Sequence, residues 1–238
     1  MESLFKKKVL IVGATGGIGS EVARLIKGSN ADVFVTGHDA DKLSKIGTEL
    51  RLTSDRIFQL DITNHKAVEQ VAEKIHQQID CLDIIINAAG IGIIKPLESL
   101  TYEDFDKTIN INLKGTFNLF KAFIPVMKAK KEGLFINIPG VLGKAPMAGA
   151  GAYSASKYGI NGLVKSVREE LKRTNIRLTN IYLGGVDTPF WDNIDMKVRR
   201  EKFITEKEAA KSIWFLCQQP KSGVVSEMVI QPFNHQVI

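Results

Sequence analysis

The sequence predicts an α/β fold of the doubly wound kind, with a mostly parallel, seven-stranded sheet and helices on both faces. Apolar, β-branched runs alternate with amphipathic segments from one end of the chain to the other. Such alternation requires crossover connections between parallel strands. The apolar runs are also continuous, as in strands that are buried on both sides. No linker, repeat or low-complexity tract divides the pattern, so we expect residues 1–238 to form a single domain.

Strands are expected where short β-branched runs are bounded by turn residues. These runs lie at residues 8–12, 32–36, 56–60, 82–86, 134–138, 176–181 and 227–230. Helices are expected where apolar residues recur with helical spacing, at about 17–28, 40–50, 64–78, 101–130, 152–173 and 205–218. Asp and Thr precede several of these segments, in "DIT" before residue 64 and in "SLTYEDF" before the fourth helix. Both residue types are typical N-caps.

Composition and charge narrow the class of protein. The net charge is +6, but its basic runs, Lys6–Lys8 and Lys128–Lys131, are short. Basic residues at a helix end complement its dipole, so we expect a solvated surface and neither a nucleic-acid nor a membrane partner. Cys81 and Cys217 are isolated within apolar segments, which favours reduced core thiols in a cytoplasmic protein. The four histidines are scattered along the chain, and no metal site is expected.

A glycine-rich loop carries the first functional signal. "VLIVGATGGIGSEVARLI" places Gly13, Gly17 and Gly19 between the first strand and the first helix. Glycines there permit a tight turn and close approach of the backbone to a pyrophosphate, and the free N–H groups of the helix favour an anion. The loop, with Thr15 and Ile18, therefore predicts a dinucleotide site in a Rossmann-type fold.

The end of the second strand bears on the choice of dinucleotide. Folds of this kind often carry an acid there that binds the ribose 2′-OH, whereas this chain has Gly37 in "VTGHDADKL". Without that carboxylate a 2′-phosphate meets no repulsion, and His38 can donate to it. Asp39 acts in the opposite sense. The pattern favours NADP, with NAD as the alternative, and His38 can equally be an ordinary turn residue.

With this loop, "NAAG" and "YSASK" in order, the chain resembles the short-chain dehydrogenase/reductase family over essentially its whole length. The resemblance implies an oxidoreductase whose cofactor also meets residues beyond the glycine loop. These are Asp61 and Ile62 near adenine, Asn87, Ala88 and Gly90 in "INAAG", and Val186 and Thr188 at the nicotinamide end. Two positions depart from the family pattern: Ala88 replaces an Asn, and Leu183 replaces a Pro.

Tyr153 and Lys157 are the candidate acid/base pair. Residues four apart share one helix face. A neighbouring ammonium and the positive nicotinamide ring of an oxidised cofactor both favour the phenolate and lower the pKa of a Tyr. Tyr153 is then expected to protonate a carbonyl as hydride arrives from the nicotinamide. The resemblance implies that Lys157 also binds the nicotinamide ribose and that Asn112, in "NINLKG", holds a water. The alternative is an exposed Tyr and Lys on an amphipathic helix.

One part of the family's catalytic set is missing. Where the family has a Ser that donates to the substrate oxygen, this chain has Gly140. Ser154 and Ser156 point elsewhere around the helix. Loss of one such donor costs about 10²–10³ in rate, so two hypotheses stand: a weak or unusual carbonyl reductase, or an impaired NADP(H)-binding sensor or partner subunit. On the first, Gly140→Ser is expected to raise carbonyl reduction at least about tenfold.

The substrate is expected to be a small carbonyl compound or alcohol under the loop at about 189–203, which we call the flap. Phe190, Trp191 and Met196 are either an apolar lid over the substrate or part of the core. Arg199 and Arg200 either meet an acidic substrate or are merely solvated. So short a flap does not imply a large pocket. The resemblance also implies a homodimer or homotetramer.

Overall fold

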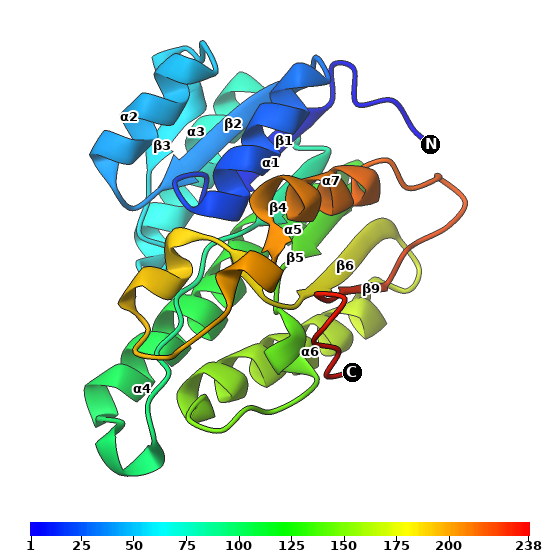
Figure 1. Ribbon diagram of the computed structural model, residues 1–238. Helices are drawn as coiled ribbons and strands as arrows, with labels where there is room; N and C mark the ends of the chain where they lie inside the picture. Colours follow the sequence, from blue (N-terminus) through cyan, green and yellow to red (C-terminus); the bar gives the residue numbers. More distant parts are fainter.

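One sheet of seven parallel strands runs through the molecule in the order β3-β2-β1-β4-β5-β6-β9 (Figure 1). The computed structural model describes residues 1–238 except for the side chain of Asn193. The strands are β1 (Lys8–Val12), β2 (Asp32–Gly37), β3 (Ile57–Gln59), β4 (Ile84–Asn87), β5 (Glu132–Asn137), β6 (Asn175–Leu183) and β9 (Glu227–Ile230). The predicted fold class is confirmed.

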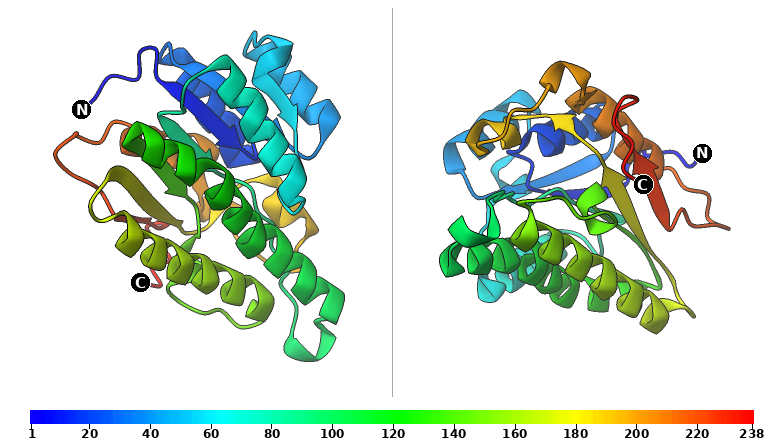
Figure 2. Two further views of the ribbon diagram at one scale, coloured as in Figure 1. Left: turned by 180° about the vertical axis from the view of Figure 1, so that it is seen from behind. Right: turned by 60° about the horizontal axis from the view of Figure 1, so that its bottom comes forward.

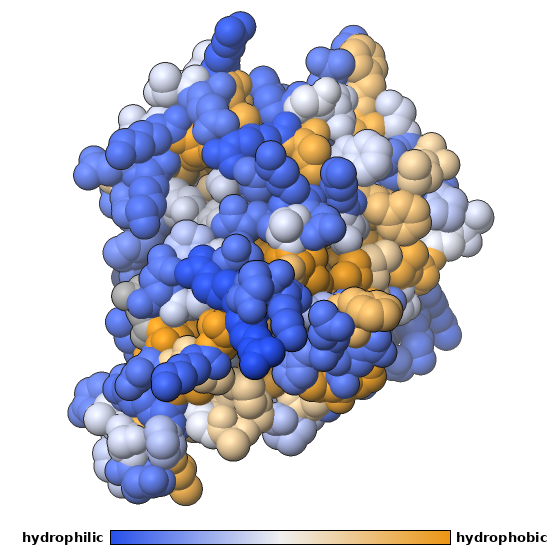
Figure 3. All heavy atoms as spheres, in the orientation of Figure 1, coloured by the Kyte–Doolittle hydropathy of each residue, from blue (hydrophilic) through white to orange (hydrophobic). Residues whose placement is uncertain are grey.

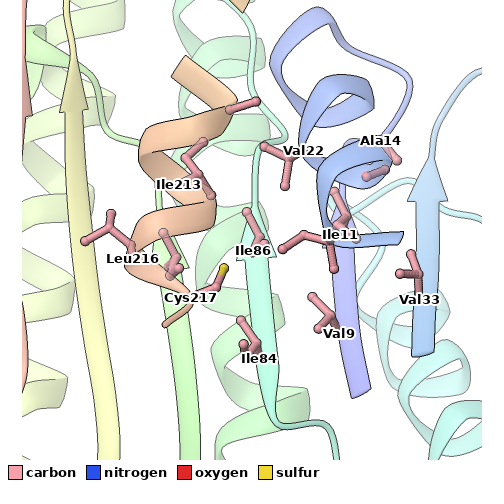
Figure 4. Packing of buried hydrophobic residues seen from close by; sticks show 14 of the residues in the cluster. Val9, Ile11, Ala14, Val22, Val33, Ile84, Ile86, Ile213, Leu216 and Cys217 are labelled. Atoms are coloured by element: carbon pink, nitrogen blue, oxygen red, sulfur yellow. The ribbon is translucent and has the colours of Figure 1, made fainter. Parts of the chain in front are cut away.

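Helices cover both faces of the sheet (Figure 2). One hydrophobic core includes buried residues of α1 (Gly17–Gly28), α2 (Ala40–Glu49) and α7 (Glu206–Leu216). The other includes residues of α3 (His65–Gln78), α5 (Gly115–Lys130) and α6 (Gly151–Leu171). Successive residues of β1 alternate between them: Val9 and Ile11 lie in the first core (Figure 4), and Leu10 and Val12 in the second. Burial on both sides explains why the strands are apolar without alternation.

The topology places a crevice at the carboxyl edge of the sheet. The chain moves outward from β1 to β2 and β3 on one side, and to β4, β5 and β6 on the other. Ligands of open α/β sheets bind where the strand order reverses in this way. The glycine loop after β1 and the "NAAG" loop after β4 both lie at this point.

Three elements differ from the sequence expectation. The segment expected as one helix over 101–130 is α4 (Tyr102–Ile109), a π-helical turn η3 (Asn110–Lys114) and α5. Such π turns occur mostly as single turns inside α-helices, so the segment remains helical throughout. A second sheet pairs β7 (Val186–Asp187) with β8 (Ile204–Thr205) and closes the base of the flap. Strands of two residues are too short to produce a periodic signal.

Two features bear on compartment and reactivity. In the part of the chain that the structure describes, no helix combines the length and apolarity needed to cross a membrane. Cys217 is buried and Cys81 half-buried, and both are free thiols. Burial raises the pKa of both thiols, so they remain protonated at neutral pH and are unreactive.

Candidate active site

A cavity of about 620 Å³ lies at the carboxyl edge of the sheet. Its wall includes Tyr153 from α6, Gly140 from the turn after β5, and Ile18 from the glycine loop. The flap and the C-terminal segment 231–238 also line it. The cavity therefore joins the predicted acid/base residue to the predicted dinucleotide loop.

Lys157 lies over the ring of Tyr153, and its ammonium and the Asn112 amide both lie beside Gly90. The Nζ atom of Lys157 lies 5.2 Å from the ring centre of Tyr153 and donates to the carbonyl oxygen of Ile138 at 3.3 Å. A Cβ atom on Gly90 would lie 3.3 Å from that Nζ and 3.1 Å from Oδ1 of Asn112. The structure thus brings together the three predicted catalytic side chains, and Lys157 and Asn112 are buried.

Asn112 occupies the π turn and is held by three hydrogen bonds. Its Nδ2 donates to the carbonyl oxygen of Ile91 and to Oγ of Ser156, both at 2.9 Å, and its Oδ1 accepts from the Ile91 amide at 2.9 Å. Both amide hydrogens are therefore used, and only a lone pair on Oδ1 is left for a water. Ser156 in turn donates to the Tyr153 carbonyl at 2.7 Å, so its hydroxyl cannot replace the missing donor.

Burial dominates the titration of the pair. It raises the pKa of Tyr153 well above that of a free phenol, and it lowers the pKa of Lys157 to about 8. The sequence analysis expected the ammonium and the oxidised nicotinamide ring together to lower the Tyr153 pKa. Without a cofactor the reverse holds, because the ammonium lies over the ring face and both groups are removed from water. Tyr153 is accordingly in its acid form, ready to donate.

Gly140 has a backbone conformation that only glycine adopts readily. Its φ is +70° and its ψ 170°, a region that is essentially restricted to glycine. Space is not the obstacle, since the nearest atom to a Cβ there would be the Leu183 carbonyl oxygen at 3.4 Å. A Ser at 140 would therefore be strained. This removes the premise of the gain expected for Gly140→Ser, which assumed that only a side chain had been lost.

The glycine loop is packed backbone against backbone. Gly13 has φ +81°, and a Cβ on it would lie 2.7 Å from the Ala89 amide nitrogen. A Cβ on Gly19 would overlap the Gly13 carbonyl oxygen. A Cβ on Gly37 would lie 2.5 Å from Cγ2 of Thr15, so the residue that replaces the usual acid also makes room for this loop. The cradle at the start of α1 fits a phosphate group.

Sequence reasoning missed one charged group at this cradle. A Cβ on Gly17 would overlap Oε1 of Glu206 and lie 3.1 Å from Cβ of Thr188. Burial raises the pKa of Glu206, and the carboxylates of Glu21 and Asp187 raise it further. At the first position of α7, an acidic residue is ordinarily explained by the helix dipole, so nothing in the sequence pattern placed Glu206 beside the glycine loop.

The residues expected at the adenosine end lie in two environments. His38 is exposed after β2, and Asp61 is exposed and accepts from Thr63. Ile62 is buried. Asp39 caps α2, accepting from the Lys42 amide at 2.9 Å and pairing with its ammonium at 3.8 Å.

The other residues predicted to contact the cofactor are mostly buried or bonded within the fold. Asn87 donates from Nδ2 to Oγ1 of Thr116 at 3.0 Å, and the Ala88 amide bonds to the Val12 carbonyl at 2.9 Å. Val186 and Thr188 are buried at the start of the flap. These residues fix the loops of the site, and their contacts with a cofactor stay a prediction.

The flap closes over Tyr153. The ring centre of Phe190 lies 5.8 Å from that of Tyr153, and Trp191 donates from Nε1 to the Val186 carbonyl at 2.9 Å. Both, with Met196, line the cavity, as the lid interpretation predicted. Arg200 instead braces the flap, with ion pairs to Asp187 at 2.5 Å and Asp192 at 2.6 Å.

The C-terminal segment forms the opposite wall. Gln231 holds it folded back, accepting from the Val237 amide at 2.6 Å and donating to the Ile238 carbonyl at 2.7 Å. The flap alone did not imply a large pocket, and the cavity of about 620 Å³ is lined by the C-terminal segment as well. No periodic pattern or motif marks this segment in the sequence.

Comparison with known proteins agrees with this geometry. The short chain dehydrogenase family matches residues 7–199, and the chain therefore belongs to the short-chain dehydrogenase/reductase family of oxidoreductases. An uncharacterised oxidoreductase of Staphylococcus saprophyticus is 27% identical over 98% of this chain and 100% of its own length.

Solved structures of the family share the fold. A metagenomic short-chain oxidoreductase in complex with NADP is similar with a TM-score of 0.83 and 29% identity, over 97% of this chain and 99% of the other. An alcohol dehydrogenase of Thermococcus sibiricus, complexed with 5-hydroxy-NADP, gives a TM-score of 0.86 and 26% identity, over 97% and 98% of the two chains.

Lys157→Met is expected to raise the stability of the cofactor-free protein near neutral pH. Each pKa unit corresponds to about 1.4 kcal/mol, so lowering the Lys157 pKa from 10.5 to about 8 destabilises the fold by about 3 kcal/mol. Loss of the hydrogen bond to Ile138 offsets about 1 kcal/mol of the gain. Urea unfolding at about pH 7 should therefore show a net gain of about 2 kcal/mol.

The sign of the pH dependence follows from linkage. Below pH 8 the folded and unfolded chains both hold the Lys157 proton, and between about 8 and 10.5 the unfolded chain alone holds it, so wild-type stability rises with pH there. The advantage of Lys157→Met should shrink across this window. Lys165→Met, an exposed position on α6, is the control, expected within about 0.5 kcal/mol of wild type. A Lys157→Met variant less stable than wild type at every pH would contradict the burial argument.

Gly140→Ser and Gly140→Ala are expected to lose similar stability, about 1–3 kcal/mol, because both put a side chain in a glycine conformation. Gly140→Ser should then reduce carbonyl substrates no faster than wild type. Urea unfolding and kcat/KM measured on the two variants together check this, since the Ala variant carries the strain without the hydroxyl. A kcat/KM of Gly140→Ser about tenfold above that of wild type would contradict this prediction. It would show that the turn relaxes and that the hydroxyl reaches the substrate oxygen.

Proposed function

We propose that the protein is an NADP(H)-dependent oxidoreductase that interconverts a carbonyl compound and an alcohol. The observation that carries this is the grouping of three side chains, in which Lys157 lies over the ring of Tyr153 and beside Asn112 at Gly90. The glycine-rich loop at the start of α1 adds a site that suits a phosphate group. An impaired protein that only bound a dinucleotide would need the glycine loop but not the pairing of Tyr153 with a buried Lys157.

The nicotinamide supplies or accepts the hydride when the cofactor is bound. In the reductive direction Tyr153 donates its phenolic proton to the substrate oxygen. The Lys157 ammonium, over the ring of Tyr153, stabilises the phenolate that remains. Asn112 fixes the loop after β4 against α6. Phe190 covers the phenol from the flap side and excludes water from it.

NADP is the proposed cofactor, with NAD as the alternative. At the end of β2 Gly37 presents no carboxylate, and Asp39 is turned to the α2 amide and ammonium of Lys42. His38 is then left to meet a 2′-phosphate, and the exposed ammonium of Lys42, paired with Asp39, lies in the same turn. The NADP complexes of the two related structures support the same choice.

A second function is favoured by Gly140. Its conformation leaves the substrate oxygen without the family's Ser donor, so a dinucleotide-binding sensor or partner subunit with little turnover is the competing proposal. We also propose a homodimer or homotetramer, supported by half-exposed Phe117 and Tyr158 on α5 and α6. The free thiols support a reducing, cytoplasmic compartment.

Tyr153→Phe is expected to lower kcat by at least about 10², because the proton donor is lost. NADPH affinity should stay within about fivefold, since at most one hydrogen bond to the cofactor is removed. The experiment titrates NADPH and NADH by fluorescence and then assays a panel of carbonyl compounds and alcohols. Tight binding with no turnover in wild type and variant alike would favour the sensor, and no binding of either dinucleotide would exclude both proposals.

Glu206→Gln is expected to tighten NADPH binding about tenfold at about pH 8, since it removes a like charge from the cradle. The raised pKa of Glu206, caused by burial, means that its carboxyl takes up a proton at a higher pH than usual. Wild type and variant should therefore converge as the pH falls. Glu201→Gln, which changes an exposed carboxylate of the flap, is the control. Equal affinities at both pH values would show that the phosphates do not lie beside Glu206.

A further inference from the structure

Three cations and a histidine line the mouth of the active-site cavity. Lys197, Arg199 and Lys202 belong to the flap, and His235 belongs to the C-terminal segment on the opposite side. All four are exposed. Among the described side chains none of the four takes part in an ion pair, and no Asp or Glu lines the cavity. Figure 3 shows strongly hydrophilic residues gathered over the segment between β7 and α7, next to apolar surface.

Arg200 shows that the free cations are not a general property of the flap. It lies next to Arg199, but its guanidinium is paired with Asp187 and Asp192 and donates to the Thr188 carbonyl at 3.1 Å. The flap therefore neutralises the cation that holds it together and leaves unpaired the cations at the cavity. The two arginines, which the sequence alone could not separate, have different tasks.

Inside the mouth the wall is mainly apolar. It is formed by side chains such as Ile94, Val141, Leu142, Met147, Phe190 and Met196. Tyr153 lies in the same wall. A cleft lined by charge of one sign, with low-dielectric walls, concentrates its field and raises the local concentration of oppositely charged ligands. The cavity thus combines the proton donor and a mainly apolar wall with exposed positive charge.

We propose that the substrate is an apolar ketone or aldehyde that ends in a carboxylate. Its carbonyl lies at Tyr153, its carbon chain along the apolar wall, and its carboxylate among Lys197, Arg199, Lys202 and His235. The assignment rests on the proposed function. In reduction, NADPH transfers hydride to the carbonyl carbon and becomes NADP⁺, and the Tyr153 phenol protonates the oxygen and is reprotonated from solvent. The product is a hydroxy acid whose carboxylate is unchanged.

The competing explanation is that these cations attract the phosphates of the dinucleotide. The phosphate cradle, however, is formed by Gly13, Gly17 and Gly19 at the start of α1, whereas the cations border the cavity mouth between the flap and the C-terminal segment. If the cations bind the substrate carboxylate, removing them lowers the affinity for the acid. If they attract the cofactor phosphates, removing them lowers the affinity for NADPH. Binding and turnover are therefore measured separately.

The experiment compares a medium-chain keto acid, with its ketone next to the terminal methyl group, with its methyl ester. Affinity for the complex with NADP⁺ is measured by calorimetry, and kcat/KM with NADPH in low salt. Wild type is expected to prefer the acid about tenfold, and about 0.5 M salt should reduce the preference by screening. Lys197→Ala/Arg199→Ala should reduce the acid-to-ester ratio at least about fivefold.

Lys74→Ala/Lys211→Ala is the matched control, because it removes two exposed cations on α3 and α7 that have no ion pair among the described side chains. It should keep the wild-type ratio. An equal acid-to-ester ratio in wild type and the flap variant overturns the proposal, and so does a loss of NADPH affinity as large as the loss for the acid. Preferred binding of the acid without turnover supports the anion site and contradicts the proposed reductase, so the two failures are distinguishable.

Discussion

The hydrogen bonds of Asn112 are the constraint on which the site depends. One amide side chain in the π turn joins the loop after β4, through Ile91, to α6, through Ser156. Because these elements come from distant parts of the chain, the amide fixes how closely α6 approaches the sheet. That approach brings the Lys157 ammonium beside Gly90 and within hydrogen-bond distance of the Ile138 carbonyl oxygen. A fully bonded amide is suited to this task, since a partly satisfied one would be destabilising.

Most of the fold and the centre of the site could be predicted from sequence because both depend on local patterns. Apolar runs and helical periodicity gave the strands and helices, and the spacing of Tyr153 and Lys157 gave their shared face. The rest depends on backbone angles and long-range contacts. The φ of Gly140 belongs to a turn that no residue pattern specifies, and Glu206 reaches Gly17 only because α7 packs on α1. The C-terminal wall likewise depends on the folding back held by Gln231.

The backbone conformation of Gly140 shows that more than a side chain distinguishes this position. If only one hydroxyl had been lost from an unchanged backbone, restoring the Ser side chain would restore the hydrogen-bond donor. Here the turn itself, from Gly140 to Gly143, is built on the glycine conformation. Restoring the side chain alone would therefore strain the turn.

Lys157 weighs against loss of function. It is a buried cation, it has no carboxylate partner among the described side chains, and its lowered pKa shows that burial disfavours its charge. Its one hydrogen bond, to the Ile138 carbonyl, is long at 3.3 Å. An apolar side chain of similar length would fill the space without that penalty. A buried lysine that destabilises the fold is accounted for if its charge serves a neighbouring group. The ring of Tyr153 lies directly beneath its ammonium. The pair is therefore better explained by proton transfer than by dinucleotide binding alone, even with glycine at position 140.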